Sequence, residues 1–141
     1  MSISGKCVCG AVSYSISKDK SEFGACHCST CRRWSGGVFL GLEVKPDEIS
    51  FEGEEHLTRY SSSQWAERAF CSKCGASMYY RITAPGPYEG VYHLGVGTLD
   101  SCDDMRLSEQ LFIDQKPNGY SFAEKTHNLT QAQFEAMFGV G

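Results

Sequence analysis

The spacing of its cysteines constrains this sequence more than any other feature. The chain has eight cysteines in 141 residues, and seven of them fall into three short groups. The groups are Cys7-Val-Cys9-Gly, Cys26-His-Cys28-Ser-Thr-Cys31 and Cys71-Ser-Lys-Cys74-Gly. Clustered cysteines in a protein of a reducing compartment more often bind a metal or do redox chemistry than form disulfide bonds.

The first and third groups are pairs of one kind. Each places two cysteines close together on a tight turn and follows the second with a glycine, which permits the left-handed backbone that a metal-binding turn needs. Two pairs supply four sulfurs, which fills a tetrahedral structural zinc site. We therefore predict that Cys7, Cys9, Cys71 and Cys74 bind a structural zinc ion, which would clamp the first strand to the middle of the chain.

The second group places three cysteines close enough in sequence to bind one metal ion locally. Three protein ligands leave the fourth tetrahedral position open for water or substrate, as in catalytic zinc sites. Arg32 and Arg33 follow directly, and nearby positive charge favours thiolate over thiol. We predict that Cys26, Cys28 and Cys31 bind a catalytic zinc ion, so that the chain holds two zinc ions.

Other uses of these cysteines stay open from the sequence. Disulfides could involve all eight, and an iron–sulfur cluster could use the closely spaced ones, although two glycine-followed pairs and a triplet agree best with zinc. Cys102 has no cysteine near it, and we expect a small buried or unligated thiol. His27 lies between two ligands with little steric room, so we expect it beside the metal or facing solvent.

Composition excludes some classes of partner. The formal net charge is −4, and seven thiolates with two divalent cations would make it more negative, which disfavours nucleic acid and anionic membranes. No apolar run approaches the ~20 residues of a transmembrane helix, and residues 1–7 lack the apolar core of a signal peptide. We expect a cytoplasmic protein whose oligomeric state stays open.

Short apolar segments predict a mainly β fold in one domain, residues 1–141. In the clearest segment, Val12, Tyr14 and Ile16 alternate with serines, as in a half-buried strand. Other candidate strands are residues 38–44, 49–51, 67–70, 77–82, 91–96 and 111–113. Almost no helix-length segment lies between them, and parallel pairing needs long crossovers, so we expect antiparallel sheets.

Two short helical segments are also predicted. Ser29 is a candidate N-cap for a turn that runs to Arg33. Near the C-terminus, Thr130 and Gln133 match a capping box, and we expect the following helix to dock its apolar face on the core of the protein and not on a partner. That face consists of Phe134, Met137 and Phe138.

The cysteine groups and their flanking residues resemble the glutathione-dependent formaldehyde-activating enzyme family, which also includes centromere protein V. The matching stretches are Cys-Val-Cys-Gly at 7–10, Cys-His-Cys-Ser-Thr-Cys-Arg-Arg at 26–33 with Ser-Gly at 35–36, and Arg-Ala-Phe-Cys-Ser-Lys-Cys-Gly at 68–75. Residues 57–62 and 97–100 extend the likeness, which covers residues 5 to about 115. Residues 117–120, Pro-Asn-Gly-Tyr, depart from the tryptophan-bearing segment that members often have there.

The resemblance implies a β-tent fold, in which zinc clamps antiparallel sheets, and it implies two zinc ions. It assigns the two pairs to the structural site and the triplet to the catalytic one, in agreement with the spacing argument. The family's named activity is a carbon–sulfur lyase reaction, whose reverse joins formaldehyde and glutathione as S-(hydroxymethyl)glutathione. The implied partners are therefore a small thiol such as glutathione and a small aldehyde.

Three thiolates would give the catalytic zinc a negative formal charge, which makes it a poor Lewis acid for water. Such a centre suits another task, which is to hold a substrate thiolate beside an electrophile. Trp34 and Tyr60 could form an apolar wall for that substrate. Glutathione has two carboxylates, so its site should present cations, and the candidates are Arg32, Arg33, Arg59, Arg68 and Lys73.

The competing interpretation is a zinc-stabilised binding or scaffold module without turnover. The open position of the three-cysteine site argues against it, because a scaffold has no use for a vacant coordination position. We identify no dedicated acid–base pair in the sequence, and the choice of thiol stays open.

Overall fold

The computed structural model describes residues 3–137. Within this range the strands are β1 (Ile3–Lys6), β2 (Ser13–Ile16), β3 (Glu22–Cys26), β4 (Phe39–Val44), β5 (Ile49–Glu52), β6 (Leu57–Ser63), β7 (Ala66–Cys71), β8 (Ser77–Ile82), β9 (Tyr92–Gly95), β10 (Arg106–Leu111) and β11 (His127–Leu129). The helices are α1 (Ser29–Ser35) and α2 (Gln131–Ala136), with 3-10 turns at η1 (Pro46–Glu48), η2 (Glu54–His56), η3 (Val96–Thr98) and η4 (Ile113–Gln115). The predicted mainly β fold with a short C-terminal helix is confirmed.

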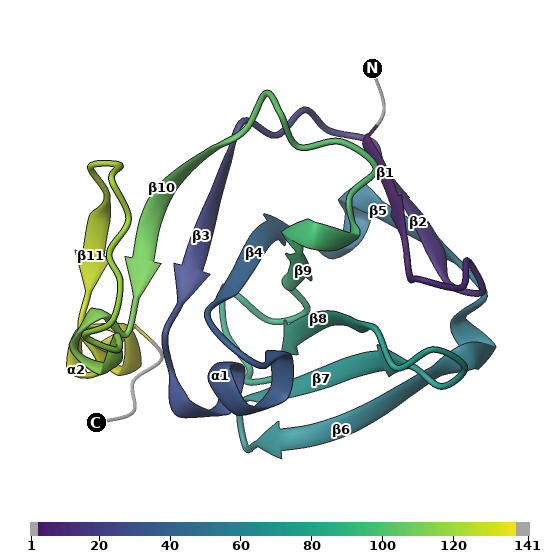
Figure 1. Cartoon of the computed structure of the whole chain (residues 1–141). Helices are drawn as coiled ribbons and strands as arrows, with labels where there is room; N and C mark the ends of the chain where they lie inside the picture. Colours follow the sequence, from purple (N-terminus) through teal and green to yellow (C-terminus); the bar gives the residue numbers. More distant parts are fainter. Residues whose placement is uncertain (1–2, 138–141) are drawn as a thin grey trace.

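The strands form two sheets (Figure 1). β1, β2 and β5 make a small antiparallel sheet, and the other strands make a large sheet in the order β11-β10-β3-β4-β9-β8-β7-β6. In Figure 1 the large sheet bends across its width. β3 and β10 stand upright on the left, whereas β6 and β7 run along the bottom. The small sheet lies on the far side of the molecule from α2.

The larger hydrophobic core joins the small sheet to the large one. β2 buries Tyr14 and Ile16, which are 3% and 0% exposed, whereas Ser13 is half-buried and Ser15 is exposed, as the alternating pattern predicts. These side chains belong to one cluster with Leu42 of β4 and Leu94 of β9. Cys71 belongs to the same cluster, so the first candidate metal centre forms an edge of this core.

One edge of the large sheet corrects the expectation of purely antiparallel pairing. β10 pairs in parallel with both β3 and β11, whereas the other pairs in this sheet are antiparallel. A parallel pair needs a long connection, which is usually helical. Between β3 and β10 the chain instead runs through β4 to β9 before it returns, so the scarcity of helix-length segments did not exclude a parallel pair.

Two local boundaries near the cysteines also differ from the predictions. The N-cap of α1 is Cys28 and not Ser29, because the Cys28 Sγ accepts a hydrogen bond from the backbone N–H of Cys31 at 3.2 Å. The strand expected at 111–113 is wrong, since β10 ends at Leu111 and Phe112 adopts a left-handed backbone with φ 56°. This turn directs the chain into η4.

The C-terminal helix docks on the core as expected. Thr130 and Gln133 form the predicted capping box through reciprocal hydrogen bonds of 2.8 and 3.2 Å. Phe134 is 5% exposed, whereas Met137 is 44% exposed, so only part of the predicted apolar face is buried. Phe138 lies outside the described residues. Neither described helix is long and apolar enough to cross a membrane.

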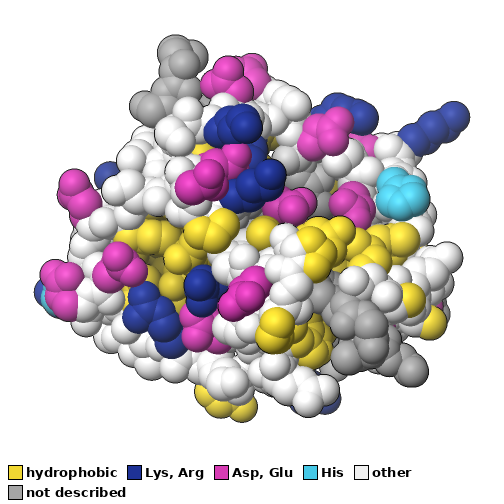
Figure 2. Space-filling view, turned by 180° about the vertical axis from the view of Figure 1, so that it is seen from behind, with side chains coloured by type: hydrophobic (Ala, Val, Ile, Leu, Met, Phe, Trp, Pro, Cys, Tyr) yellow, Lys and Arg dark blue, Asp and Glu magenta, His cyan; other side chains and the backbone are white. Residues whose placement is uncertain are grey.

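The surface carries charges of both signs. On the face shown in Figure 2, Lys and Arg side chains are interspersed with Asp and Glu around a band of apolar side chains. Surfaces that bind nucleic acid typically gather their basic residues on one face or along one helix. The prediction that nucleic acid is not a partner stays a prediction.

Candidate metal centres and the adjoining pocket

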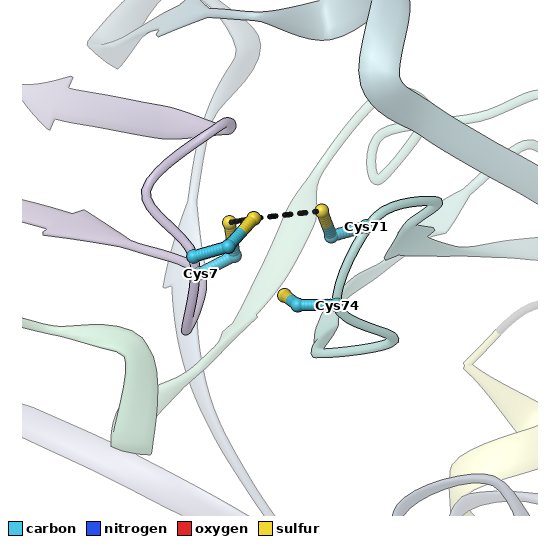
Figure 3. Close-up of side chains that lie close together, drawn as sticks. Cys7, Cys71 and Cys74 are labelled. Atoms are coloured by element: carbon cyan, nitrogen blue, oxygen red, sulfur yellow. Dashed lines mark hydrogen bonds between the residues drawn. The ribbon is translucent and has the colours of Figure 1, made fainter.

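The first candidate centre joins two turns that are far apart in the sequence, and we call it the four-cysteine cluster. Cys7 and Cys9 follow β1, Cys71 ends β7, and Cys74 lies in the turn after it. The Sγ atom of Cys9 is 3.7 Å from that of Cys7 and 3.8 Å from that of Cys71. Figure 3 shows Cys7 facing Cys71 and Cys74 across the gap between the turns. The structure therefore brings together the four cysteines that the sequence grouped.

Glycine shapes both of these turns. Gly10 and Gly75 have φ angles of 81° and 79°, a left-handed conformation that glycine adopts without steric cost. The N–H of Gly10 donates to the carbonyl of Cys7 at 3.3 Å, and that of Gly75 donates to the carbonyl of Cys71 at 2.8 Å. Each glycine thus closes the tight turn that holds a cysteine pair together.

The sulfur positions of the four-cysteine cluster fit a zinc ion. Zn–S bonds of about 2.3 Å in tetrahedral geometry separate the sulfurs by about 3.8 Å. The two Sγ–Sγ distances of 3.7 and 3.8 Å agree with this spacing, and all four sulfurs lie within 4.8 Å of one another. The cluster could hold a metal ion with little rearrangement.

The second candidate centre consists of Cys26, Cys28 and Cys31, which we call the triplet. Their sulfurs also lie within 4.8 Å of one another. Cys26 ends β3, Cys28 caps α1 and Cys31 lies in the first turn of α1. Cys26 and Cys31 are 5% and 1% exposed, and Cys28 is half-buried. The triplet could hold a metal ion and leave one tetrahedral position for another ligand.

The protonation of the triplet shows why a cation suits it. Hydrogen bonds from Cys26 and then from Cys31 lower the pKa of Cys28 to about 2. The hydrogen bond to Cys28 in turn raises the pKa of Cys26 well above its ordinary value. One thiolate is therefore stabilised at the expense of its neighbours, and added positive charge would favour the ionised form of all three. A divalent metal supplies that charge and binds thiolates.

A pocket of about 170 Å³ lies beside the triplet and is lined by all three of its cysteines. Much of its wall is aromatic and comes from Trp65, Tyr80, Phe112 and Phe134. At its polar side, a hydrogen-bonded chain runs from Gln115 to Gln131 (2.5 Å) and on to Glu135 (3.2 Å). A cavity of ~150 Å³ can hold a benzene molecule, so the pocket is large enough for the reacting end of a small substrate.

Comparison with known proteins agrees with this arrangement. Residues 2–115 match the family model described as glutathione-dependent formaldehyde-activating enzyme. The chain belongs to this family. It is also 31% identical over 126 residues to an uncharacterized lyase of Schizosaccharomyces pombe, in an alignment that covers 89% of each protein.

Two further relatives match over shorter stretches, and both bear the name "Putative glutathione-dependent formaldehyde-activating enzyme". The protein from Halomonas elongata is 32% identical over 87 residues, which is 56% of this chain and 55% of the relative. The protein from Colletotrichum graminicola is 35% identical over 78 residues, which is 54% of this chain and 41% of the relative. The alignments therefore span about half of these two proteins. The family's members are named as enzymes, which supports an enzyme here.

Five cationic side chains were candidates for binding the carboxylates of glutathione, and one of them lies at the pocket beside the triplet. Arg68 lines the pocket beside the triplet. Arg32 lines a separate cavity on another side of α1, and Arg59 forms an ion pair on the surface of β6. Arg33 and Lys73 are exposed and do not line this pocket. The expected cluster of carboxylate-binding cations is therefore not assembled there.

Arg68 itself faces the triplet. Its Nη1 donates a hydrogen bond to the Sγ of Cys31 at 3.2 Å, and the side chain is buried, with 5% exposure. The guanidinium lies 5.2 Å from the ring centroid of Trp34 and 5.1 Å from that of Tyr80. Sequence reasoning named Arg68 only as one of five candidate carboxylate ligands, because nothing in its neighbours indicated that β7 would bury it beside the triplet.

The aromatic wall also differs from expectation. Trp34 packs on Phe39, with ring centroids 5.2 Å apart, and beneath Arg68, whereas Tyr60 is 64% exposed on β6. Trp65 and Phe112 instead line the pocket, and sequence reasoning missed them. Trp65 lies in the turn between β6 and β7, outside the predicted strands, and Phe112 lies in the bend after β10, where a strand was wrongly predicted.

His27 and Cys102 lie outside both clusters. His27 is 2% exposed, so it does not face solvent, and its Nε2 lies 2.8 Å from Oε1 of Gln110. Tyr120 packs near the His27 ring, with centroids 6.3 Å apart, so the segment at 117–120 lies against this histidine and does not line the pocket beside the triplet. Cys102 is half-buried and packs against the core between the sheets.

Proposed function

We propose that the chain is a single zinc-binding domain, residues 1–141, that acts as a carbon–sulfur lyase on the adduct of a small thiol with a small aldehyde. The four-cysteine cluster would hold a structural zinc ion, and the triplet would hold the catalytic one. The observation that carries this proposal is the three-sulfur cluster at the wall of a pocket. The names of the relatives make glutathione and formaldehyde the first candidates.

A zinc ion on the triplet would supply one open coordination position for the sulfur of the substrate and would favour its thiolate form. The chain's own part is to hold the aldehyde carbon against that sulfur, which removes the entropy of encounter from the reaction. Trp65, Phe112 and Phe134 line the pocket and reduce its water content, which strengthens electrostatic interactions inside it.

The purified protein is expected to contain up to two zinc ions per chain, measured by mass spectrometry of the metal against protein concentration. Mild chelation should remove the metal of the triplet first, because a three-ligand site keeps an exchangeable position whereas a site with four thiolates is closed. Iron in place of zinc, or metal-free protein prepared under reducing conditions, would contradict the assignment.

Glutathione is expected to bind to the zinc-loaded protein through its sulfur. Its thiol should lose a proton on binding, so calorimetry in buffers of different ionisation enthalpy should detect proton release. The apparent affinity should rise with pH until the free thiol itself ionises, which for an unperturbed cysteine thiol happens at a pKa of ~8.5. S-methylglutathione is the matched control, because it keeps both carboxylates and has no thiol proton. Equal affinity for the two compounds without proton release would rule out binding through sulfur.

A further inference from the structure

Arg68 is the single cation among the described residues that line the pocket beside the triplet. A buried guanidinium is costly unless its charge is compensated, and within residues 3–137 its hydrogen-bond partner is the Sγ of Cys31 at 3.2 Å. Its Nε is buried and has no hydrogen-bond partner among the described residues. The side chain thus reaches the triplet with its charge directed at sulfur.

The position of this guanidinium is well defined. It lies over the rings of Trp34 and Tyr80, at 5.2 and 5.1 Å from their centroids, within the range of cation–π attraction. Arg68 on β7 also lies directly opposite Tyr80 on β8 in the antiparallel register of these strands. A guanidinium has five N–H donors, and Cys31 takes one of them. The other N–H groups on its terminal nitrogens are available to a ligand in the pocket.

The proposed reaction moves negative charge over a short distance. When the adduct forms, a lone pair of the thiolate makes the carbon–sulfur bond, and the π electrons of the carbonyl move to oxygen, which then takes a proton from water. In the lyase direction the hydroxyl proton returns to water, the carbonyl re-forms, and the pair of the breaking carbon–sulfur bond returns to sulfur. The charge therefore passes between a sulfur and an oxygen that share one carbon.

The geometry points to Arg68 as a catalytic residue that stabilises the adduct oxygen while it also donates to Cys31. This inference rests on the proposed function, since it concerns the same reaction at the same site. A donor fixed beside the sulfurs and lining the pocket can follow the charge without reorganising, which is the property of an oxyanion-stabilising group. The hydroxyls of Ser62 and Ser63 are less suited, because they are neutral. The Ser62 hydroxyl also donates its proton to the carbonyl of Ala66, whereas that of Ser63 accepts from the N–H of Trp65.

The test compares zinc-loaded wild type with Arg68→Met, which removes the donors, and Arg68→Lys, which keeps a point charge without the guanidinium fork. Exchange between ¹³C-formaldehyde with glutathione and their adduct is followed by NMR, and glutathione affinity by calorimetry. Removing an oxyanion donor costs about 100-fold or more in rate. We expect Arg68→Met to lose that much turnover with a loss of affinity at least tenfold smaller, and Arg68→Lys to lose less.

Arg81→Lys is the matched control. Arg81 also stacks over an aromatic ring, that of Tyr92 at 5.6 Å, and pairs with Glu67 at 3.6 Å, but it does not line the pocket. It should keep wild-type turnover.

A second readout needs no turnover. In cobalt-loaded protein, Arg68→Met should shift the sulfur-to-cobalt charge-transfer band to longer wavelength, because Cys31 loses a hydrogen-bond donor. Arg81→Lys should leave this band unchanged.

Three outcomes would overturn the inference alone. In the first, wild type catalyses the exchange and both Arg68 variants match it. In the second, turnover and affinity fall by the same factor, which would reduce Arg68 to a general binding role. In the third, the cobalt band of Arg68→Met does not move, which would reduce Arg68 to a packing role. A zinc-loaded wild type that binds glutathione but does not accelerate the exchange would instead refute the proposed function, and the role of Arg68 in that reaction with it.

Discussion

Replacement of Cys71 by serine is expected to lower the melting temperature by about 10 °C, or to abolish soluble expression. Zinc binding to four thiolates contributes ~10–16 kcal/mol in small zinc domains, so one ligand of four is worth about 3 kcal/mol. In a domain of this size, 1 kcal/mol corresponds to ~2–4 °C. Cys71 is 0% exposed and belongs to the core between the sheets, and the cluster joins the turn after β1 to the end of β7. Loss of the metal therefore removes the link between two segments that are far apart in the sequence.

Cys102→Ser is the matched control for this experiment. Cys102 is half-buried and lies outside both clusters, so the same chemical change should shift the melting temperature by no more than about 2 °C, since substitutions away from special features stay within ~0.5 kcal/mol. The measurement is thermal unfolding by circular dichroism together with zinc content. A Cys71→Ser protein that melts like wild type and keeps its zinc would contradict a structural role.

The cysteine clusters could be predicted from the sequence because their geometry is mostly local. A pair followed by glycine forms its turn from a few residues, as Gly10 and Gly75 show with their positive φ angles. The triplet likewise spans the end of β3 and the first turn of α1. The one long-range step, the meeting of the two pairs, followed from the need of a tetrahedral metal for four ligands.

The surroundings of the triplet could not be predicted in the same way, because they come from long-range packing. Arg68 reaches Cys31 from β7, and the pocket wall combines Trp65 from the turn before that strand with Phe134 from α2. The large sheet brings these segments together by an order that the strand pattern does not encode, including the parallel pair of β3 and β10. Burial of an arginine depends on such neighbours and leaves no periodic signal in the sequence.

Replacement of Cys28 by serine is expected to abolish turnover while the fold survives. Cys28 caps α1 by accepting a hydrogen bond from the N–H of Cys31, and serine is among the preferred N-cap residues. The substitution therefore preserves the helix start and removes one thiolate from a metal site that is local in sequence. We expect the melting temperature to fall by about 4 °C at most, which corresponds to ~1 kcal/mol. Zinc content should drop from two ions to one, and adduct exchange should fall to the uncatalysed rate.

Cys28→Ala separates the two roles of the side chain, because it loses the cap as well as the ligand. It should be less stable than Cys28→Ser by the ~1 kcal/mol of a missing cap. If Cys28→Ser unfolded the chain whereas Cys71→Ser did not, the structural and catalytic assignments of the two clusters would have to be exchanged.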